Sequence, residues 1–275
     1  MKINRIIPFS CVDGPGNRMV IFLQGCNFHC GYCHNPETIH ECISCGTCLA
    51  ACPTGALSMQ AGQVHWNAAR CCHCDACLQA CPNLSSPRTH ELSSGQLMKK
   101  ILRAADFLDG ITISGGECTR HPAFLQDLFE QVRSKTRLSC FIDTNGSLDL
   151  SQYPDLVACT DGFMLDVKTI DPQEHQRLTG CSNDIVRQNL DFLLAAGKLY
   201  EVRTVLAPGL SHEKTIRYVA AKIQDRCIYK LLKYRPLGVR PEGLQQFGRQ
   251  NTVPAQLDAM LSLARACGAS KAAII

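Results

Sequence analysis

Short apolar runs alternate with segments of helical periodicity along the chain after residue 88. This order is typical of an α/β domain in which helices separate parallel strands. Helical spacing of apolar residues, with a capping serine before and a glycine after, predicts helices over 94–109 and 182–196, and a last helix is expected over about 254–266. The runs that predict strands are 19–23, 111–113, 138–142, 163–167, 200–206 and 228–234, with a seventh candidate at 272–275.

Polar or special residues lie in or after each of the first six strand runs. Cys26 follows the first, Gly115 the second and Asp143 the third, while Arg203 lies in the fifth. Parallel strands of a barrel end on one rim, where such folds place their chemistry, so we expect one shared site. Outside residues 37–87 the chain has room for about seven βα units at ~31 residues each. The expected architecture is therefore a partial, open (β/α)6 barrel of the TIM-like kind.

Cysteine usage narrows the chemistry. The 275 residues include 19 cysteines, and 12 of them lie between Cys26 and Cys81. No wholly apolar run exceeds about five residues, far short of the ~18 that a spanning helix needs, so we expect a cytoplasmic protein with no membrane partner. In a reducing compartment, clustered thiols indicate metal or redox chemistry rather than disulfides. The net charge of +4 is spread without a long basic run, so no nucleic-acid partner is expected, and the more basic stretch 212–250 is interpreted as a solvated or docking face.

Two copies of the pattern CxxCxxCxxxCP lie in the segment 37–87. The spacing suits two 4Fe-4S clusters, because three cysteines of a tight loop bind one cluster while the fourth ligates the other. We therefore expect a two-cluster ferredoxin-like domain at 37–87, with a short paired strand at 64–66, inserted between barrel parts at 1–36 and 88–275. A pair of four-cysteine zinc sites is the alternative, which the proline after each fourth cysteine disfavours. The first cluster would take Cys42, Cys45, Cys48 and Cys81, and the second Cys71, Cys74, Cys77 and Cys52.

A third cysteine pattern, CxxxCxxC, directly follows the first barrel strand and contains Cys26, Cys30 and Cys33. Three thiolates on a four-iron cluster leave one iron open, and that iron can bind a small molecule. The alternatives are a zinc site completed by His29 or His34, or three buried free cysteines.

This triad, with Tyr32 before its last cysteine, and the Gly115-Gly116-Glu117 motif resemble the radical S-adenosylmethionine superfamily. Further motifs resemble the glycyl-radical-enzyme activating enzymes, and the match spans nearly the whole chain. Members with a two-cluster ferredoxin insertion form a subset, and the opening residues 6–13 most resemble the YjjW-type activases. The further motifs are Asp13-Gly14-Pro15-Gly16-Asn17-Arg18, Cys33-His34-Asn35-Pro36, Asp143-Thr144-Asn145-Gly146, Met164-Leu165-Asp166-Val167-Lys168 and His175-Gln176.

The resemblance implies that the open iron chelates the amino and carboxylate groups of S-adenosylmethionine. Glycines lacking a Cβ let the backbone approach the methionine part, Glu117 can accept from its ammonium, and Lys168 can pair with its carboxylate. A plainer alternative is that Asp166 and Lys168 pair with each other at the rim. Arg235 stands where many members have a histidine, which leaves its contact with the cofactor open. The implied cofactor-binding residues are Tyr32, Gly115, Gly116, Glu117, Asn145, Lys168 and Arg235, with Asp143, Thr144, Met164 and Asp166 around a monovalent cation.

The implied activity is reductive cleavage of S-adenosylmethionine to a 5′-deoxyadenosyl radical, which installs a glycyl radical on a partner glycyl radical enzyme. Asp13 and Arg203 match positions that meet the partner's glycine loop, although Arg203 could simply pair with a barrel carboxylate. A low-potential donor such as flavodoxin or ferredoxin would supply the electron through the inserted clusters, and oxygen sensitivity is expected of such an anaerobic enzyme. The competing functions are a radical enzyme acting on another substrate, a ferredoxin-type electron carrier and a zinc-stabilised binding module. Cys11, Cys72 and Cys118 are expected to be incidental thiols, with an extra cluster ligand or a resolving thiol as the alternatives.

Overall fold

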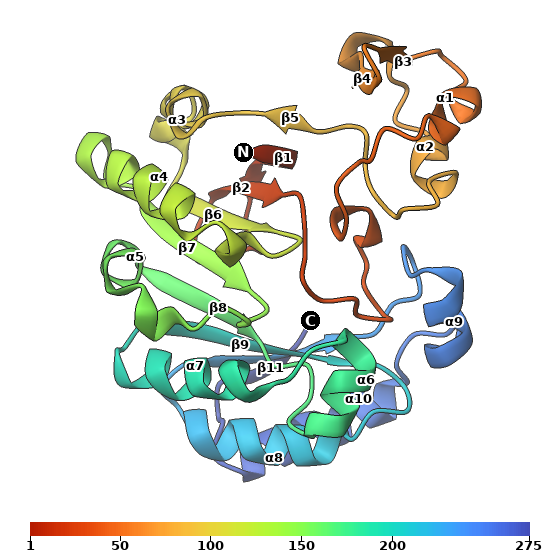
Figure 1. The fold of residues 1–275 in the computed structure, drawn as a ribbon. Helices are drawn as coiled ribbons and strands as arrows, with labels where there is room; N and C mark the ends of the chain where they lie inside the picture. The colour runs from red at the N-terminus through yellow and green to blue at the C-terminus, as the bar shows by residue number, and fades with distance from the viewer.

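One open sheet of nine strands organises residues 1–275, all of which the computed structural model describes (Figure 1). The strand order is β11-β10-β9-β8-β7-β6-β2-β1-β5. Strands β2 and β6 to β11 are parallel, whereas β1 and β5 add antiparallel at one edge. The bounds are β1 Lys2–Ser10, β2 Arg18–Leu23, β5 His90–Glu91, β6 Gly110–Gly115, β7 Ser139–Thr144, β8 Gly162–Asp166, β9 Leu199–Leu206, β10 Ile228–Lys233 and β11 Ala272–Ile274.

The seven strands predicted from the apolar runs are all present. The sheet does not close, because β5 and β11 at its two edges each pair with one neighbour only, so the expected open parallel-strand architecture is confirmed. Strands β1 and β5 were not predicted. In β1 only Ile3 is fully buried, and Lys2, Asn4 and Arg5 interrupt the apolar pattern. An edge strand of this kind is held by its backbone ladder to β2 rather than by a buried face.

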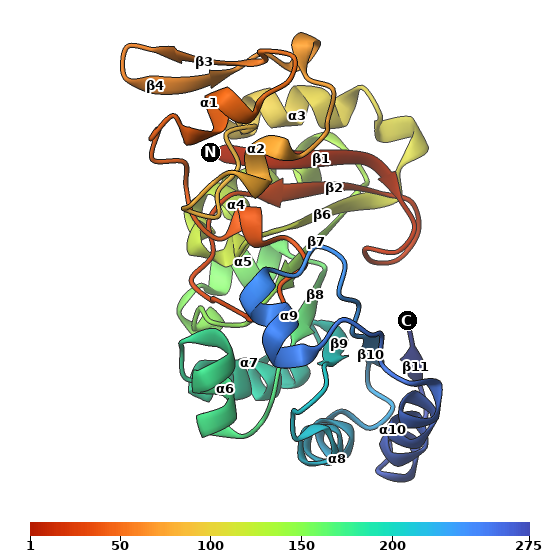
Figure 2. The same ribbon diagram turned by 90° about the vertical axis from the view of Figure 1, so that its right-hand side faces the viewer.

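Helices follow the parallel strands and cover the outer face of the sheet (Figures 1 and 2). Helices α7 and α10 confirm the predictions over 182–196 and 254–266, but the helix predicted over 94–109 ends at Leu102. A 3-10 turn at 105–107 follows, because the Asp109 backbone N–H and carboxylate bond to Asn17 and fix this stretch against the β1–β2 loop. The bounds are α3 Ser94–Leu102, α4 Pro122–Lys135, α5 Pro154–Cys159, α6 Pro172–Thr179, α7 Asp184–Ala195, α8 His212–Ile223, α9 Pro241–Phe247 and α10 Pro254–Ala266.

A core of 50 buried residues lies between the sheet and these helices. Short, fully buried strands such as β6 carry Ile111 and Ile113 toward it, as expected for a parallel sheet covered on its face. No helix combines the length and the apolar character that crossing a membrane requires.

The segment 37–87 stands apart from the sheet (Figure 1) and has its own small apolar cluster of three buried residues, Cys48, Leu57 and Cys77. It contains α1 Thr47–Ala51, the hairpin of β3 Leu57–Gln60 and β4 Gln63–Trp66, and α2 Ala76–Gln79. Strand β4 confirms the paired strand expected at 64–66. The Lys2–Glu41 ion pair (2.7 Å) and the bond from Gln24 Nε2 to the His40 carbonyl (2.6 Å) join the segment to the barrel.

Candidate active site

A cavity of about 410 Å³ lies where β2, β6, β7 and β8 end, and we call it the rim cavity. Fourteen of the predicted catalytic and cofactor-binding residues line it, and a cavity of this size accommodates a ligand of several hundred daltons. They are Asp13, Cys26, Cys30, Tyr32, Cys33, Gly115, Gly116, Glu117, Asp143, Thr144, Asn145, Asp166, Lys168 and Arg203.

The loop after β2 brings Cys26, Cys30 and Cys33 to one wall of the rim cavity. Its backbone is fixed by bonds from the Cys26 N–H to the Ile39 carbonyl and from the His29 N–H to the Thr179 carbonyl, each 2.8 Å. Burial raises the pKa of Cys26 to about 11 and that of Cys30 to about 12. Burial therefore favours the neutral thiols, and a nearby cation or metal centre would lower these pKa values.

The glycines after β6 are required by the neighbouring backbone. A Cβ on Gly115, whose φ is +123°, would lie 2.2 Å from the Leu23 nitrogen, and one on Gly116 would lie 2.3 Å from the Gly25 carbonyl oxygen. The turn can therefore pass against the end of β2 only with glycine at both positions. From the sequence, the two glycines were expected to let the backbone approach the cofactor. The structure shows that they are also needed for packing against the chain's own backbone at Leu23 and Gly25.

Glu117 is fully buried and joins two strand ends. Its carboxylate accepts from the backbone N–H of Thr119 (2.9 Å) and of Asn145 (2.7 Å), and from the hydroxyls of Thr119 (2.6 Å) and Thr144 (2.7 Å). Burial raises its pKa, and these four donors oppose that shift. The side chain thus links the turn after β6 to the turn after β7 as well as lining the rim cavity.

Ion pairs cross the floor of the rim cavity. Lys168 Nζ lies 2.5 Å from Asp166, Arg203 Nη1 lies 3.1 Å from Asp143, and Arg203 Nε pairs with Glu201. Burial works against the charge of Lys168, but the Asp166 carboxylate prevails and holds its pKa well above the usual value. Both plain pairings considered from the sequence, Asp166 with Lys168 and Arg203 with a barrel carboxylate, are therefore present.

Asp13 lies on the loop between β1 and β2. Its carboxylate accepts from the Ser10 hydroxyl (2.5 Å), and its carbonyl accepts from the Thr112 hydroxyl (2.6 Å). Buried Arg18 donates to the same Thr112 oxygen (2.7 Å) and to the Pro15 carbonyl (3.1 Å), which fixes the loop against the sheet.

The structure does not bring Met164 and Arg235 to the wall of the rim cavity. Met164 is fully buried behind it, where its sulfur accepts from Arg203 Nη2 at 3.1 Å. Arg235 has an exposed side chain beyond the end of β10.

Sequence reasoning missed the contribution of α9. Arg240, just before this helix, donates to the carbonyls of His29 (3.2 Å) and Cys30 (3.4 Å). Gly243 packs on the carbonyl of Gly31. The rings of Phe247 and Tyr32 pack edge to face, with their centroids 5.6 Å apart. Arg240, Gly243 and Phe247 belong to no sequence motif, since their importance arises only when α9 folds back over the cysteine loop (Figure 2).

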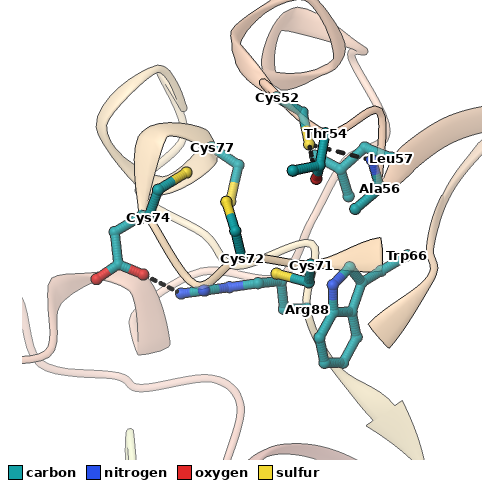
Figure 3. A pocket seen from close by; sticks show the side chains of 11 residues that line it. Cys52, Thr54, Ala56, Leu57, Trp66, Cys71, Cys72, Cys74, Cys77 and Arg88 are labelled. Carbon is teal, nitrogen blue, oxygen red and sulfur yellow. Dashed lines mark hydrogen bonds and ion pairs between the residues drawn. The ribbon is translucent and has the colours of Figure 1, made fainter. Parts of the chain in front are cut away.

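The cysteines of the segment 37–87 line two further cavities. The first cysteine cavity holds Cys42, Cys45, Cys48 and Cys81, and the second holds Cys52, Cys71, Cys74 and Cys77 together with Cys72. The fourth cysteine of each sequence repeat thus lies in the cavity of the other repeat (Figure 3 shows the second). No three His, Cys, Asp or Glu side chains converge closely enough to hold a single metal ion.

Comparisons with known proteins agree with this geometry. A sequence profile of the Radical SAM superfamily matches residues 20–219. The indoleacetate decarboxylase activating enzyme of Tractidigestivibacter scatoligenes is 32% identical over 263 residues, covering 84% of this chain and 82% of that protein. The choline trimethylamine-lyase activating enzyme of Oleidesulfovibrio alaskensis is 29% identical over 293 residues, covering 96% and 94%.

Among solved structures, Streptococcus suis SuiB bound to its precursor peptide has a TM-score of 0.59 at 14% identity, covering 93% of this chain and 48% of that one. This likeness concerns the fold alone. With the profile match and the sequence relatives, the cysteine loop and the glycine turn at the rim lead to one assignment: the chain belongs to the radical SAM superfamily and, within it, to the glycyl-radical-enzyme activating enzymes.

Proposed function

We propose that Cys26, Cys30 and Cys33 hold a 4Fe-4S cluster in the rim cavity and that S-adenosylmethionine binds at its open side. The observation that carries this is the convergence of three thiols from one loop on a cavity that also exposes the glycine turn. The buried hydroxyl of Tyr32 has no hydrogen-bond partner and faces this same cavity, which suits a site that holds a further polar group. When bound, the reduced cluster supplies the electron that cleaves the sulfonium to methionine and a 5′-deoxyadenosyl radical.

The chain's own residues would bind and orient the cofactor. The backbone of Gly115 and Gly116 offers hydrogen-bonding groups to the methionine part, and Glu117 accepts from its ammonium in addition to fixing the turns. Lys168 would exchange its partner Asp166 for the methionine carboxylate, since both acceptors compete for one buried ammonium. Tyr32 and Asn145 lie nearer the nucleoside end in this arrangement.

Released from Lys168, Asp166 can join Asp143 and Thr144 around a monovalent cation. Burial raises the pKa of Asp143, and a bound cation would lower it again. Met164 lies behind these groups and would reach the cation only through a shift of Arg203, whose guanidinium now donates to its sulfur. Arg235 would contact the cofactor only if its exposed side chain turned inward.

The protein substrate is a glycyl radical enzyme, and we propose that its glycine loop enters beside Asp13 and Arg203. Both residues line the rim cavity and come from different parts of the sheet. Their charged side chains can bond the exposed backbone of an extended loop and hold its glycine Cα toward the cofactor. Hydrogen abstraction then requires only close positioning, without a general base.

For the segment 37–87 we propose a ferredoxin-like domain inserted between barrel parts 1–36 and 88–275. It would hold two 4Fe-4S clusters, one on Cys42, Cys45, Cys48 and Cys81 and one on Cys71, Cys74, Cys77 and Cys52. Support comes from the fourth cysteines, because Cys52 of the first repeat lies in the second cavity and Cys81 of the second repeat lies in the first. In two-cluster ferredoxins the fourth cysteine of each repeat likewise ligates the other cluster. A low-potential donor such as flavodoxin or ferredoxin would then pass electrons inward through this domain.

The test is 5′-deoxyadenosine formation from S-adenosylmethionine by anaerobically reconstituted, reduced protein. We expect product from the wild type and from Cys227→Ala, a buried thiol outside all three cavities, but none from Cys30→Ala. Three clusters predict about twelve irons per chain. Absence of product despite about twelve irons would favour the electron-carrier function over the activase assignment of these residues.

A further inference from the structure

The two cysteine cavities are matched in most of the features that set a cluster's potential. Equivalent cysteines have the same burial: Cys42 and Cys71 are half-buried, and Cys45 and Cys74 are exposed. The next equivalent cysteines in the two repeats are both buried, and the fourth are both half-buried. Solvent exposure therefore does not separate the two sites.

Neutral hydrogen bonds are matched at the fourth cysteine of each set. In the first cavity Cys81 lies 3.4 Å from the Ser85 hydroxyl, and in the second Cys52 lies 3.8 Å from the Thr54 hydroxyl. The first cavity has one further hydroxyl contact, since Cys45 lies 3.4 Å from the Thr47 hydroxyl, and one backbone N–H bonds to a thiol in each cavity, from Ser44 to Cys42 (3.4 Å) and from Ala56 to Cys52 (3.2 Å). The second cavity differs in its charged and indole groups, and a charged donor acts more strongly on a cluster's charge than a neutral hydroxyl does.

The second cavity alone is lined by a cation and an indole. Arg88 has a side chain only 16% exposed and is fixed through an ion pair of 2.6 Å from Nη2 to Asp75. Trp66 has a buried Nε1 that lacks a hydrogen-bond partner. Figure 3 shows Arg88 and Trp66 on the two sides of Cys71, so both side chains are available to sulfur atoms in this cavity.

The β-hairpin explains how this asymmetry arises from the sequence. Val64 and Trp66 are two residues apart in β4 and project from the same face of the strand. Val64 lines the first cavity and Trp66 the second, so the same strand places an aliphatic group over one set of thiols and an N–H donor over the other.

Resting on the ferredoxin-like assignment above, we infer that the two inserted clusters are not equivalent: Arg88 and Trp66 give the cluster in the second cysteine cavity the higher reduction potential. Reduction adds one negative charge to the cluster, and a nearby guanidinium and N–H donor stabilise that charge. The second cluster therefore accepts the first electron and stores it, while the first cluster is the stronger reductant.

Asp75 provides a second test, in which the potential of the second cluster should change in the opposite direction. Its carboxylate is 56% exposed, pairs with Arg88 and also lines the second cavity, so it offsets part of the cationic charge there. Neutralising this carboxylate should therefore raise the potential of the second cluster further. Asparagine suits the position, since Asp75 has φ +61°, a conformation that asparagine tolerates.

The experiment is a potentiometric titration followed by electron paramagnetic resonance. The 275-residue chain carries alanine at Cys26, Cys30 and Cys33, so that only the inserted clusters contribute, and iron is counted first. We expect about eight irons per chain and two separate one-electron steps. Arg88→Gln should lower the midpoint potential of the upper step by ~59 mV, which is a tenfold change in the equilibrium constant for one electron. Trp66→Phe should lower the same potential by less.

Arg103→Gln is the matched control, because it removes the same charge from an exposed side chain that lines neither cysteine cavity, and it should leave both steps unchanged. Arg88→Lys should keep the midpoint potential of the upper step close to that of the parent chain. Asp75→Asn should raise that potential. If about eight irons are present but Arg88→Gln leaves both midpoint potentials unchanged or shifts both equally, the inference is wrong while the ferredoxin-like assignment stands. Fewer than about eight irons in the parent chain would overturn the ferredoxin-like assignment, and the inference with it.

Discussion

Replacing Gly243 by alanine tests how closely α9 must approach the cysteine loop. An ideal Cβ at this position would lie 1.9 Å from the Gly31 carbonyl oxygen and 2.8 Å from Val239 Cγ1. A relaxed C···O contact is ~3.3 Å, so α9 and the loop must separate by ~1.4 Å. Helix propensity alone would favour alanine by ~1 kcal/mol, but crowding against backbone costs ~1–3 kcal/mol.

The displaced loop carries Cys30 and its neighbours, so the larger effect is on chemistry. A misplacement of ~1 Å at a reacting centre can lower a rate by ~10²-fold. We therefore expect Gly243→Ala to form 5′-deoxyadenosine ~10²-fold more slowly than the wild type in a single-turnover anaerobic assay, while keeping its folded barrel.

Gly95→Ala is the matched control. Gly95 lies in α3 with nothing within 4 Å of the added Cβ, so this variant should gain up to ~1 kcal/mol of stability and keep its activity. A Gly243→Ala protein with the rate and iron content of the wild type would refute the idea that α9 positions the loop.

Three further predictions address the charged groups. Arg203→Met leaves Asp143 and fully buried Glu201 without this partner and should lower the free energy of unfolding by ~3 kcal/mol in denaturant titrations; a loss below ~1 kcal/mol would contradict the ion-pair reading. Lys168→Met should weaken S-adenosylmethionine binding at least ~10-fold by calorimetry on the cluster-loaded protein, and an unchanged Kd would exclude its contact with the carboxylate. Burial lowers the pKa of His212 below 6.5, so the folded state keeps it neutral while the unfolded state binds a proton as pH falls through 6.5, and acidification therefore favours unfolding. His212→Gln should flatten the fall of Tm between about pH 7.5 and 5.5, and an equally steep fall in both proteins would argue against this linkage.

The rim could be predicted from the sequence because its residues follow short apolar runs, separated by segments of helical periodicity, that indicate buried strands. Asp143 and Lys168, far apart in the chain, could be placed in one site from parallel topology alone, and both line the rim cavity. The same logic fails for β1, in which Asn4 and Arg5 break the alternation and an antiparallel ladder supplies the stability.

Contacts that depend on how elements fold back could not be predicted. Arg240 and Gly243 belong to no motif, and their role depends on α9 lying over the cysteine loop. Two of the four hydrogen bonds that occupy Glu117 come from Thr144 and Asn145 at the end of β7, which the GGE motif does not encode. The pairing of Lys168 with Asp166 could be proposed but not decided from sequence, since it depends on burial and distance.

The small core of the segment 37–87 bears on the order in which this protein matures. Two of its three buried core residues, Cys48 and Cys77, are thiols that we assign to clusters, which leaves Leu57 as the one purely structural member. The barrel, with its 50 buried residues, can fold unaided during synthesis. The segment has too little apolar surface for that, so we expect iron and sulfide delivery to be its folding step, with nascent chains awaiting cluster assembly as a folded barrel carrying an unstructured loop.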